Sequence, residues 1–215
     1  MPQSRDRLVR TLLQTYGRTY AEEAGIRLTD KPGPLFQLIV LTMLLSKPIS
    51  SDLAVAAARE LFASGYRTPQ SILDASWQDR VDALGRGHYR RYDESTSTLL
   101  AKASQHCLDR WRGDLRRMRA EAHGDRQRLQ AFLTEFPGIG PIGADIFIRE
   151  VQAIWPEYRP SVDAKVLDGA RALHLPPTAI TTLARPEDVP RLTSALVRVG
   201  RARRLPEDIR AAVAR

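Results

Sequence analysis

Three glycines and two prolines fall within residues 136 to 143, in the segment FPGIGPIGAD. An apolar helical pattern precedes this segment, and another begins directly after it. Proline ends a helix, and glycine permits backbone conformations and close approaches that a Cβ atom would bar. The segment therefore predicts two helices joined by a tight hairpin.

Such a hairpin can bind an anion without any charged side chain. Its amide groups and the positive end of the second helix can hold a nucleic-acid phosphate through the backbone, without reading a base. An ordinary glycine-rich connection between packed helices is the alternative. The residues expected to form the anion site are Pro137, Gly138, Ile139, Gly140, Ile142 and Gly143.

A carboxylate follows the hairpin. Asp163 lies twenty-one residues after Ile142, in PSVDAKVLDGARAL, at the expected N-terminus of the next helix. The positive end of a helix favours a negative charge, which suits an electrostatic stabiliser. Asp is also a common helix N-cap, and this is the alternative role for Asp163.

The segment GHYRRYDES, residues 87 to 95, combines aromatic and basic side chains. The rings of Tyr89 and Tyr92 can stack on bases, with core packing as the alternative. Arg90 and Arg91 suit phosphate contacts, or form a solvated turn.

The charge of the chain favours a polyanionic partner. The formal charge is +8, with 29 Arg and 4 Lys residues, and the sequence pI is about 10.1. An excess of this size favours nucleic acid, although arginine abundance also arises from compositional drift.

The single cysteine and the short apolar runs indicate where the protein is located in the cell and whether it holds a metal. Cys107 cannot form an internal disulfide or a multi-cysteine metal site, so we expect no metal and a reducing cytoplasm. The apolar run from Leu38 to Leu45 is far shorter than the roughly 20 residues that span a bilayer, and the N-terminal segment lacks a signal-peptide core. We therefore expect a cytoplasmic protein with no membrane association.

Helical periodicity runs through nearly the whole sequence, which predicts an all-α fold. An amphipathic pattern from Leu8 to Tyr20 ends at Gly25, and short helices are expected to start at Thr68 and Ser76. The pattern over residues 35–46 is apolar on every face, as in a helix surrounded by others. Further helices are expected over residues 52–65, 92–111, 124–136, 163–173, 186–200 and 206–214.

FPGIGPIGAD followed by SVDAKVLDGARAL resembles the signature of the endonuclease III superfamily of DNA glycosylases, a helix-hairpin-helix with a Gly/Pro-rich loop and an aspartate. The order of the segments agrees, from the apolar helix ending in MLLS through the GRGHYRRY turn to the hairpin and Asp163. The resemblance covers roughly residues 33 to 173. It implies two helical lobes, with double-stranded DNA bound across the cleft between them. A six-helix barrel-like lobe would span residues 32–157 and contain the hairpin, and residues 1–31 with 158–215 would form the lobe that carries Asp163.

Two departures from the family pattern bear on chemistry. Bifunctional members place a lysine where this chain has Ile142, and an alkyl side chain cannot form a Schiff base with an abasic sugar. The cysteine-rich loop that holds an iron–sulfur cluster in many members is replaced by RARRLPEDIRAAVAR. The chain is thus similar to a subgroup without the cluster and the hairpin lysine. We expect no cofactor, apart from a monovalent cation that the hairpin could hold.

Two further departures bear on the substrate. The glutamine that many members insert into the DNA stack is replaced by Pro48, which removes the usual wedge. Adenine glycosylases carry a glutamate on the apolar helix, and LIVLTMLLS has no carboxylate. An adenine-mismatch role is therefore not expected, and the sequence does not identify the base.

The resemblance implies a role for Asp163. Breaking an N-glycosidic bond builds positive charge on the sugar, so a carboxylate near C1′ stabilises the transition state and orients water. We expect a monomeric, monofunctional DNA glycosylase of base excision repair that hydrolyses the bond to a flipped damaged or modified base. The alternative is a non-catalytic DNA-binding protein that kept the hairpin.

The resemblance also assigns supporting residues. Lys47 lies where the family's base pocket opens, and the pocket is expected to include Lys47, Tyr89 and Tyr92. Arg90, Arg91 and Lys165 are expected to contact DNA. Lys47 or Lys165 could also act as a displaced lyase amine.

Overall fold

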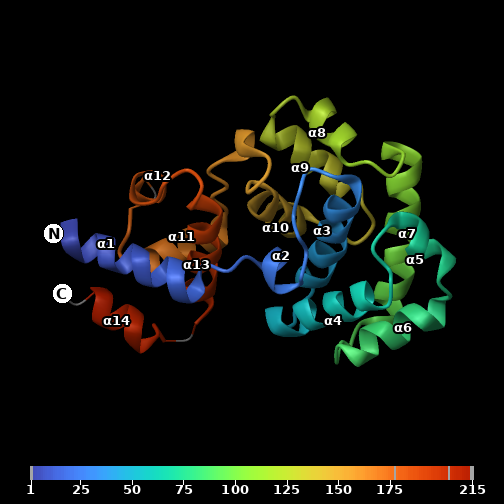
Figure 1. Ribbon diagram of the computed structural model, residues 1–215, viewed down its shortest axis with the longest axis horizontal. Helices are drawn as coiled ribbons and strands as arrows, with labels where there is room; N and C mark the ends of the chain where they lie inside the picture. The colour runs from blue at the N-terminus through green and yellow to red at the C-terminus, as the bar shows by residue number, and fades with distance from the viewer. Residues whose placement is uncertain (1, 177, 203, 214–215) are drawn as a thin grey trace. The chain divides into compact units, whose positions relative to one another are not determined.

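The computed structural model describes residues 2–176, 178–202 and 204–213 (Figure 1). In these residues the regular structure is entirely helical, with no β-strand, so the predicted all-α fold is confirmed. The chain divides into two compact units. We call Ala21–Ile154 the hairpin unit, and Met1–Tyr20 with Trp155–Arg215 the terminal unit.

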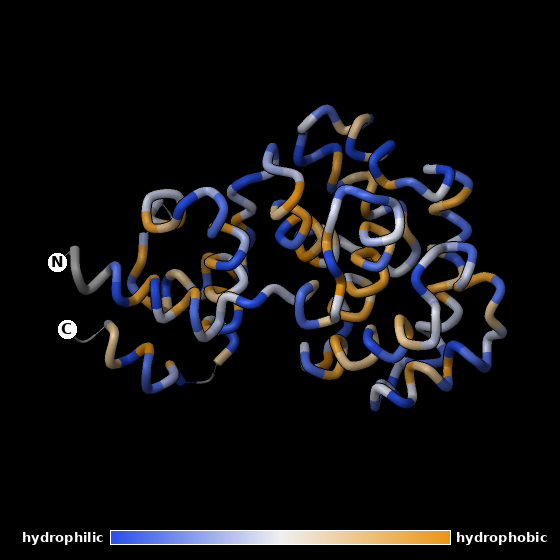
Figure 2. Tube along the Cα trace, in the orientation of Figure 1, coloured by the Kyte–Doolittle hydropathy of each residue, from blue (hydrophilic) through white to orange (hydrophobic). Residues whose placement is uncertain are grey.

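The hairpin unit is built around one apolar helix, α3 (Pro32–Leu45). Its side chains from Leu35 to Leu44 are buried, except that of Gln37, and Figure 2 shows this helix as a hydrophobic run inside the unit. Helices α4 and α10 pack against it. The remaining helices are α2 (Tyr20–Glu23), α4 (Ser51–Ala63), α5 (Pro69–Asp74), α6 (Trp77–Arg86), α7 (Asp93–Trp111), α8 (Arg116–Ala122), α9 (Arg126–Thr134) and α10 (Pro141–Val151).

Polar side chains fix where several of these helices begin. The side chains of Ser50, Thr68, Ser76 and Asp125 each accept a backbone N–H from the first turn of α4, α5, α6 and α9. These bonds satisfy amide groups that a helix leaves without partners at its start. The expected starts at Thr68 and Ser76 are confirmed.

The terminal unit brings both ends of the chain onto a core of its own. It contains α1 (Pro2–Thr11), the π-helical turn η1 (Leu12–Tyr16), the 3₁₀ turn η2 (Pro156–Tyr158), α11 (Ala164–Ala172), α12 (Ala179–Leu183), α13 (Val189–Arg201) and α14 (Glu207–Val213). Helices α11 and α13 cross closely, since a Cβ atom on Gly169 would lie 2.0 Å from the carbonyl oxygen of Leu196. The shared core includes Leu8, Leu12, Val166, Leu192, Leu196 and Ile209.

The unit boundaries differ from the predicted ones in residues 21–31 and 155–157. The N–H of Ala21 donates to Glu150 Oε2 at 2.8 Å, and Asp30 pairs with Arg119 at 2.8 Å. Both contacts join this segment to the hairpin unit. The first predicted helix is also interrupted, because the chain leaves helical geometry between Tyr16 and Tyr20.

No helix in the described ranges is long and apolar enough to cross a bilayer.

Candidate functional site

The predicted hairpin is present between α9 and α10. Gly138 has φ +92°, a conformation that residues with a side chain rarely adopt, and the N–H of Ile139 donates to the carbonyl of Phe136 at 3.0 Å. Phe136 and Ile139 are buried, so the turn is anchored in the core on both sides of Gly138. The helix-hairpin-helix expected from the sequence is therefore formed.

Helix α10 begins with its amide groups open. Gly140 is the N-cap and has no side chain to accept a bond, and Pro141 has no N–H to donate. In the part of the chain that the structure describes, no acceptor is bound to the N–H groups of Ile142 or Gly143. The first turn also contains no acidic residue. These features leave the positive end of α10 ready to hold an anion.

Close packing explains why small residues surround this helix start. A Cβ atom on Gly143 would lie 2.6 Å from Ser46 Oγ, so α10 rests against the end of α3. A Cβ atom on Gly138 would lie 3.3 Å from both Met43 and Leu99. The contact with Ser46 brings the segment that starts at Lys47 beside the hairpin. The sequence gives no local signal for this contact.

Two of the residues that departed from the family pattern, Ile142 and Pro48, lie at the start of α10 and in the turn after α3. Ile142 is 70% exposed, although it is a large apolar residue. Lys47 is partly buried, and Pro48 is exposed in the turn after α3. The structure thus places an alkyl group, and no amine, at the start of α10.

The structure corrects the interpretation of Tyr89. Its side chain is 2% exposed, its hydroxyl lies 3.3 Å from Thr96 Oγ1, and burial raises the pKa of the hydroxyl above its ordinary value. A ring enclosed in this way has no free face for a base, so the core-packing alternative holds for Tyr89. Its neighbour Tyr92 is partly exposed, with its ring 6.5 Å from that of Tyr89.

Arg90 and Arg91 are exposed beside these rings, and the Arg91 guanidinium lies 5.2 Å from the centre of the Tyr92 ring. Their turn begins at Gly87, where a Cβ atom would lie 2.5 Å from Ala57 Cα on α4. This close approach explains the second glycine in GRGHYRRY, Gly87. Both arginines remain available for phosphate contacts.

Asp163, in the terminal unit, is the N-cap of α11. Its Oδ1 accepts the N–H groups of Lys165 at 2.8 Å and Val166 at 3.0 Å, and the residue is 7% exposed. The two bonds fix the orientation of the carboxylate. Lys165 is exposed, and its Nζ lies 3.3 Å from Asp168 Oδ2.

The cysteine of this chain does not fit an iron–sulfur cluster. Such clusters are held by four thiolates in most proteins, and the chain has one cysteine. Cys107 is buried within α7, and burial raises the pKa of its thiol to about 12. It is a small apolar residue of the core.

Comparison with known proteins identifies the fold. No protein-family model matches the chain, and no curated protein matches it. A solved structure of a trapped endonuclease III–DNA covalent intermediate, in an estranged-adenine complex, is similar with a TM-score of 0.50. The likeness covers 89% of this chain and 84% of that chain, at 15% sequence identity. The protein therefore has the two-lobed, all-α fold of endonuclease III.

Proposed function

We propose that the protein is a monofunctional DNA glycosylase of base excision repair, a member of the endonuclease III-like superfamily. The observation that carries the proposal is the hairpin, a glycine turn followed by a helix start with open amides, within the endonuclease III fold. The neighbour with this fold was solved as a covalent complex with DNA, which supports DNA as the partner of this chain.

The hairpin binds DNA by its backbone in this proposal. The N–H groups of Ile142 and Gly143 donate to a phosphate, and the α10 dipole adds a favourable field. Because these contacts reach the sugar–phosphate chain and not the bases, they position the protein without selecting a sequence. Arg90, Arg91 and Lys165 add further phosphate contacts.

Asp163 supplies the chemistry. Cleavage of the N-glycosidic bond leaves positive charge on the sugar, and a negative carboxylate beside C1′ stabilises that charge. The same carboxylate orients the water that attacks C1′; the base leaves with the bonding electrons and takes up the proton that the water loses. The two amide bonds to Oδ1 support this role, because a carboxylate with a fixed orientation does not have to reorganise as the reaction proceeds.

The exposed alkyl group of Ile142 supports hydrolysis over lyase chemistry. A lyase forms a Schiff base between an amine and the abasic sugar, and Ile142 has no amine to offer. No metal takes part in the proposed reaction.

A screen of duplexes with single oxidised, alkylated, deaminated or otherwise modified bases tests the proposal. Strands carrying the substrate base should break after hot alkali and stay intact without it, because the product is an abasic site. A screen in which the protein binds duplexes but releases no base would instead support the non-catalytic DNA-binding alternative.

A further inference from the structure

The positive charge of the chain is concentrated in the terminal unit. Residues 1–20 and 155–215 hold 15 of the 33 Lys and Arg residues and 8 of the 25 Asp and Glu residues, a formal charge of +7. The hairpin unit holds the other 18 basic and 17 acidic residues, a formal charge of +1. The unit with the phosphate-binding hairpin thus contributes little to the net charge.

Ion pairs engage at least five of the 18 basic residues in the hairpin unit. These pairs are Arg86–Glu60 at 3.3 Å, Arg110–Glu121 at 2.6 Å, Arg116–Asp114 at 2.6 Å, Arg119–Asp30 at 2.8 Å and Arg126–Asp145 at 2.9 Å. Each pair cancels charge locally and weakens the field that a distant phosphate would meet.

The terminal unit contains exposed arginines that are not matched in this way. Within the described ranges, no carboxylate lies at ion-pair distance from six of them. One of the six, Arg191, donates to the Leu13 carbonyl at 2.9 Å. We call the other five the terminal basic surface: Arg7, Arg10, Arg201, Arg204 and Arg210.

Several acidic residues of the terminal unit are engaged elsewhere. Asp168 pairs with both Lys165 and Arg171, and Asp188 pairs with Arg185 at 2.8 Å. Asp208 Oδ1 accepts the Tyr16 hydroxyl at 2.9 Å. Within the described ranges, none of these carboxylates lies at ion-pair distance from the terminal basic surface, and its helices α1 and α14 carry three acidic residues of their own, Asp6, Glu207 and Asp208.

The fold brings together the two helices that carry Arg7, Arg10 and Arg210, while Arg201 ends α13 and Arg204 lies between α13 and α14. Helix α14 packs against α1, and Figure 1 shows the two helices side by side within the terminal unit. Leu8 on α1, Leu12 at the start of η1 and Ile209 on α14 belong to the buried core. Arg7 and Arg10, three residues apart, share the opposite, solvent face of α1.

We propose that the terminal basic surface binds the phosphates of duplex DNA and supplies most of the salt-dependent part of DNA binding. The inference rests on the proposed function for its occupant, since DNA is the polyanion that the hairpin would hold. A surface that only keeps the protein soluble is the competing interpretation. A second competing interpretation applies to Arg201 alone: it lies in the last turn of α13, where its positive charge can stabilise the helix through the helix dipole.

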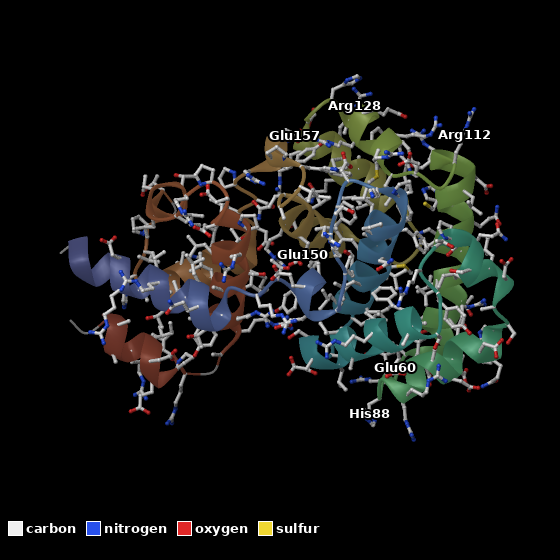
Figure 3. The ribbon with its side chains drawn as sticks, viewed as in Figure 1. Glu60, His88, Arg112, Arg128, Glu150 and Glu157 are labelled. Atoms are coloured by element: carbon white, nitrogen blue, oxygen red, sulfur yellow. The ribbon has the colours of Figure 1, made fainter. Side chains whose placement is uncertain are left out.

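Two triple variants of equal charge separate these interpretations. One is Arg201→Gln, Arg204→Gln and Arg210→Gln. The control is Arg112→Gln, Arg117→Gln and Arg128→Gln in the hairpin unit, where all three arginines are exposed. Figure 3 shows Arg112 and Arg128 extending away from the ribbon.

Affinity for a short undamaged duplex is measured between about 50 and 200 mM salt, because each neutralised phosphate adds about 0.9 to the slope of log K against log salt. The terminal triple variant should lose about two to three units of slope, and the control triple variant should keep the wild-type slope. Thermal melting of each variant confirms that the fold is intact and measures any contribution of Arg201 to α13.

Equal slopes for the wild type and the terminal triple variant would overturn the inference, as would an equal loss in the control. So would a wild type that binds no duplex. A wild type that releases no base, combined with a reduced slope in the terminal triple variant, would reject the glycosylase and leave this inference standing. Base release by the wild type, combined with an unchanged slope in the terminal triple variant, would support the glycosylase and reject this inference.

Discussion

At the scale of single residues, Ile142 separates hydrolysis from lyase chemistry. Because its exposed side chain is an alkyl group, the hairpin cannot form a Schiff base with an abasic sugar. Borohydride added during turnover should therefore trap little or no protein on DNA. Trapping is measured as a covalent protein–DNA band on a denaturing gel.

Replacing Ile142 with Lys provides the positive control for this trapping assay, because it adds an amine at the start of α10. Strong trapping by the wild type would contradict the prediction and direct attention to the two remaining candidate amines. The variants Lys47→Ala and Lys165→Ala would then identify which of them reacts.

Single residues also show where sequence reasoning succeeds. Gly138 was expected to need the freedom of glycine, and its φ of +92° bears this out. Tyr89 could not be assigned from sequence, because aromatic side chains suit both a core and a base stack. The contact between Gly143 and Ser46 joins residues far apart in the chain, so no local pattern reveals it.

At the scale of elements, the open start of α10 should respond to a new N-cap. In Gly140→Ser, the added hydroxyl can accept the N–H of Ile142 or Gly143, so stability should change by only a few tenths of a kcal/mol. The same hydroxyl competes with a phosphate for those amides. DNA binding should therefore weaken on all sequences alike, as measured by fluorescence anisotropy.

Gly33→Ser is the matched control, because a Cβ atom on Gly33 also meets open space. It should leave DNA binding unchanged. If Gly140→Ser bound DNA as tightly as the wild type, the amides of α10 would not be a phosphate site.

The helix pair that leads into the hairpin should give stability a pH dependence. His106 on α7 lies edge-on to Phe136, with ring centres 4.6 Å apart, and its Nε2 is 3.8 Å from Glu135 Oε2. Burial lowers the pKa of His106 below its ordinary value, outweighing the opposite effect of Glu135. As pH falls below about 6.5, the unfolded chain gains a proton that the folded chain resists, so stability decreases.

Denaturant unfolding of the wild type and of His106→Gln, measured from about pH 7.5 to 5.5, isolates this contribution. The variant should lose less stability than the wild type as the pH falls. Identical pH profiles for the two proteins would show that His106 does not contribute.

Helices with strong periodicity or clear caps were predictable, and short ones with neither signal were not. α3, α7 and α13 follow apolar patterns long enough to identify. α12 has five residues and η1 is a π-helical turn, so neither repeats a pattern often enough to stand out. The break before α2 depends on packing that periodicity does not record.

At the scale of the whole molecule, the sequence predicted an all-α chain with a helix-hairpin-helix, and the fold agrees. It did not predict how charge divides between the units. The net charge of +8 belongs to the whole chain, and its concentration in one unit appears only when both chain ends are seen to fold together. Which residues share a unit depends on long-range packing.

Base release by Asp163→Asn tests the central claim most directly. Asn is as good an N-cap as Asp, so the variant should melt like the wild type and bind an abasic-site duplex equally well. It lacks the negative charge that opposes the developing cation, so its single-turnover rate of base release should fall by about a hundredfold to ten-thousandfold. A native rate in a folded Asp163→Asn variant would contradict the account and leave Asp163 as a helix cap alone.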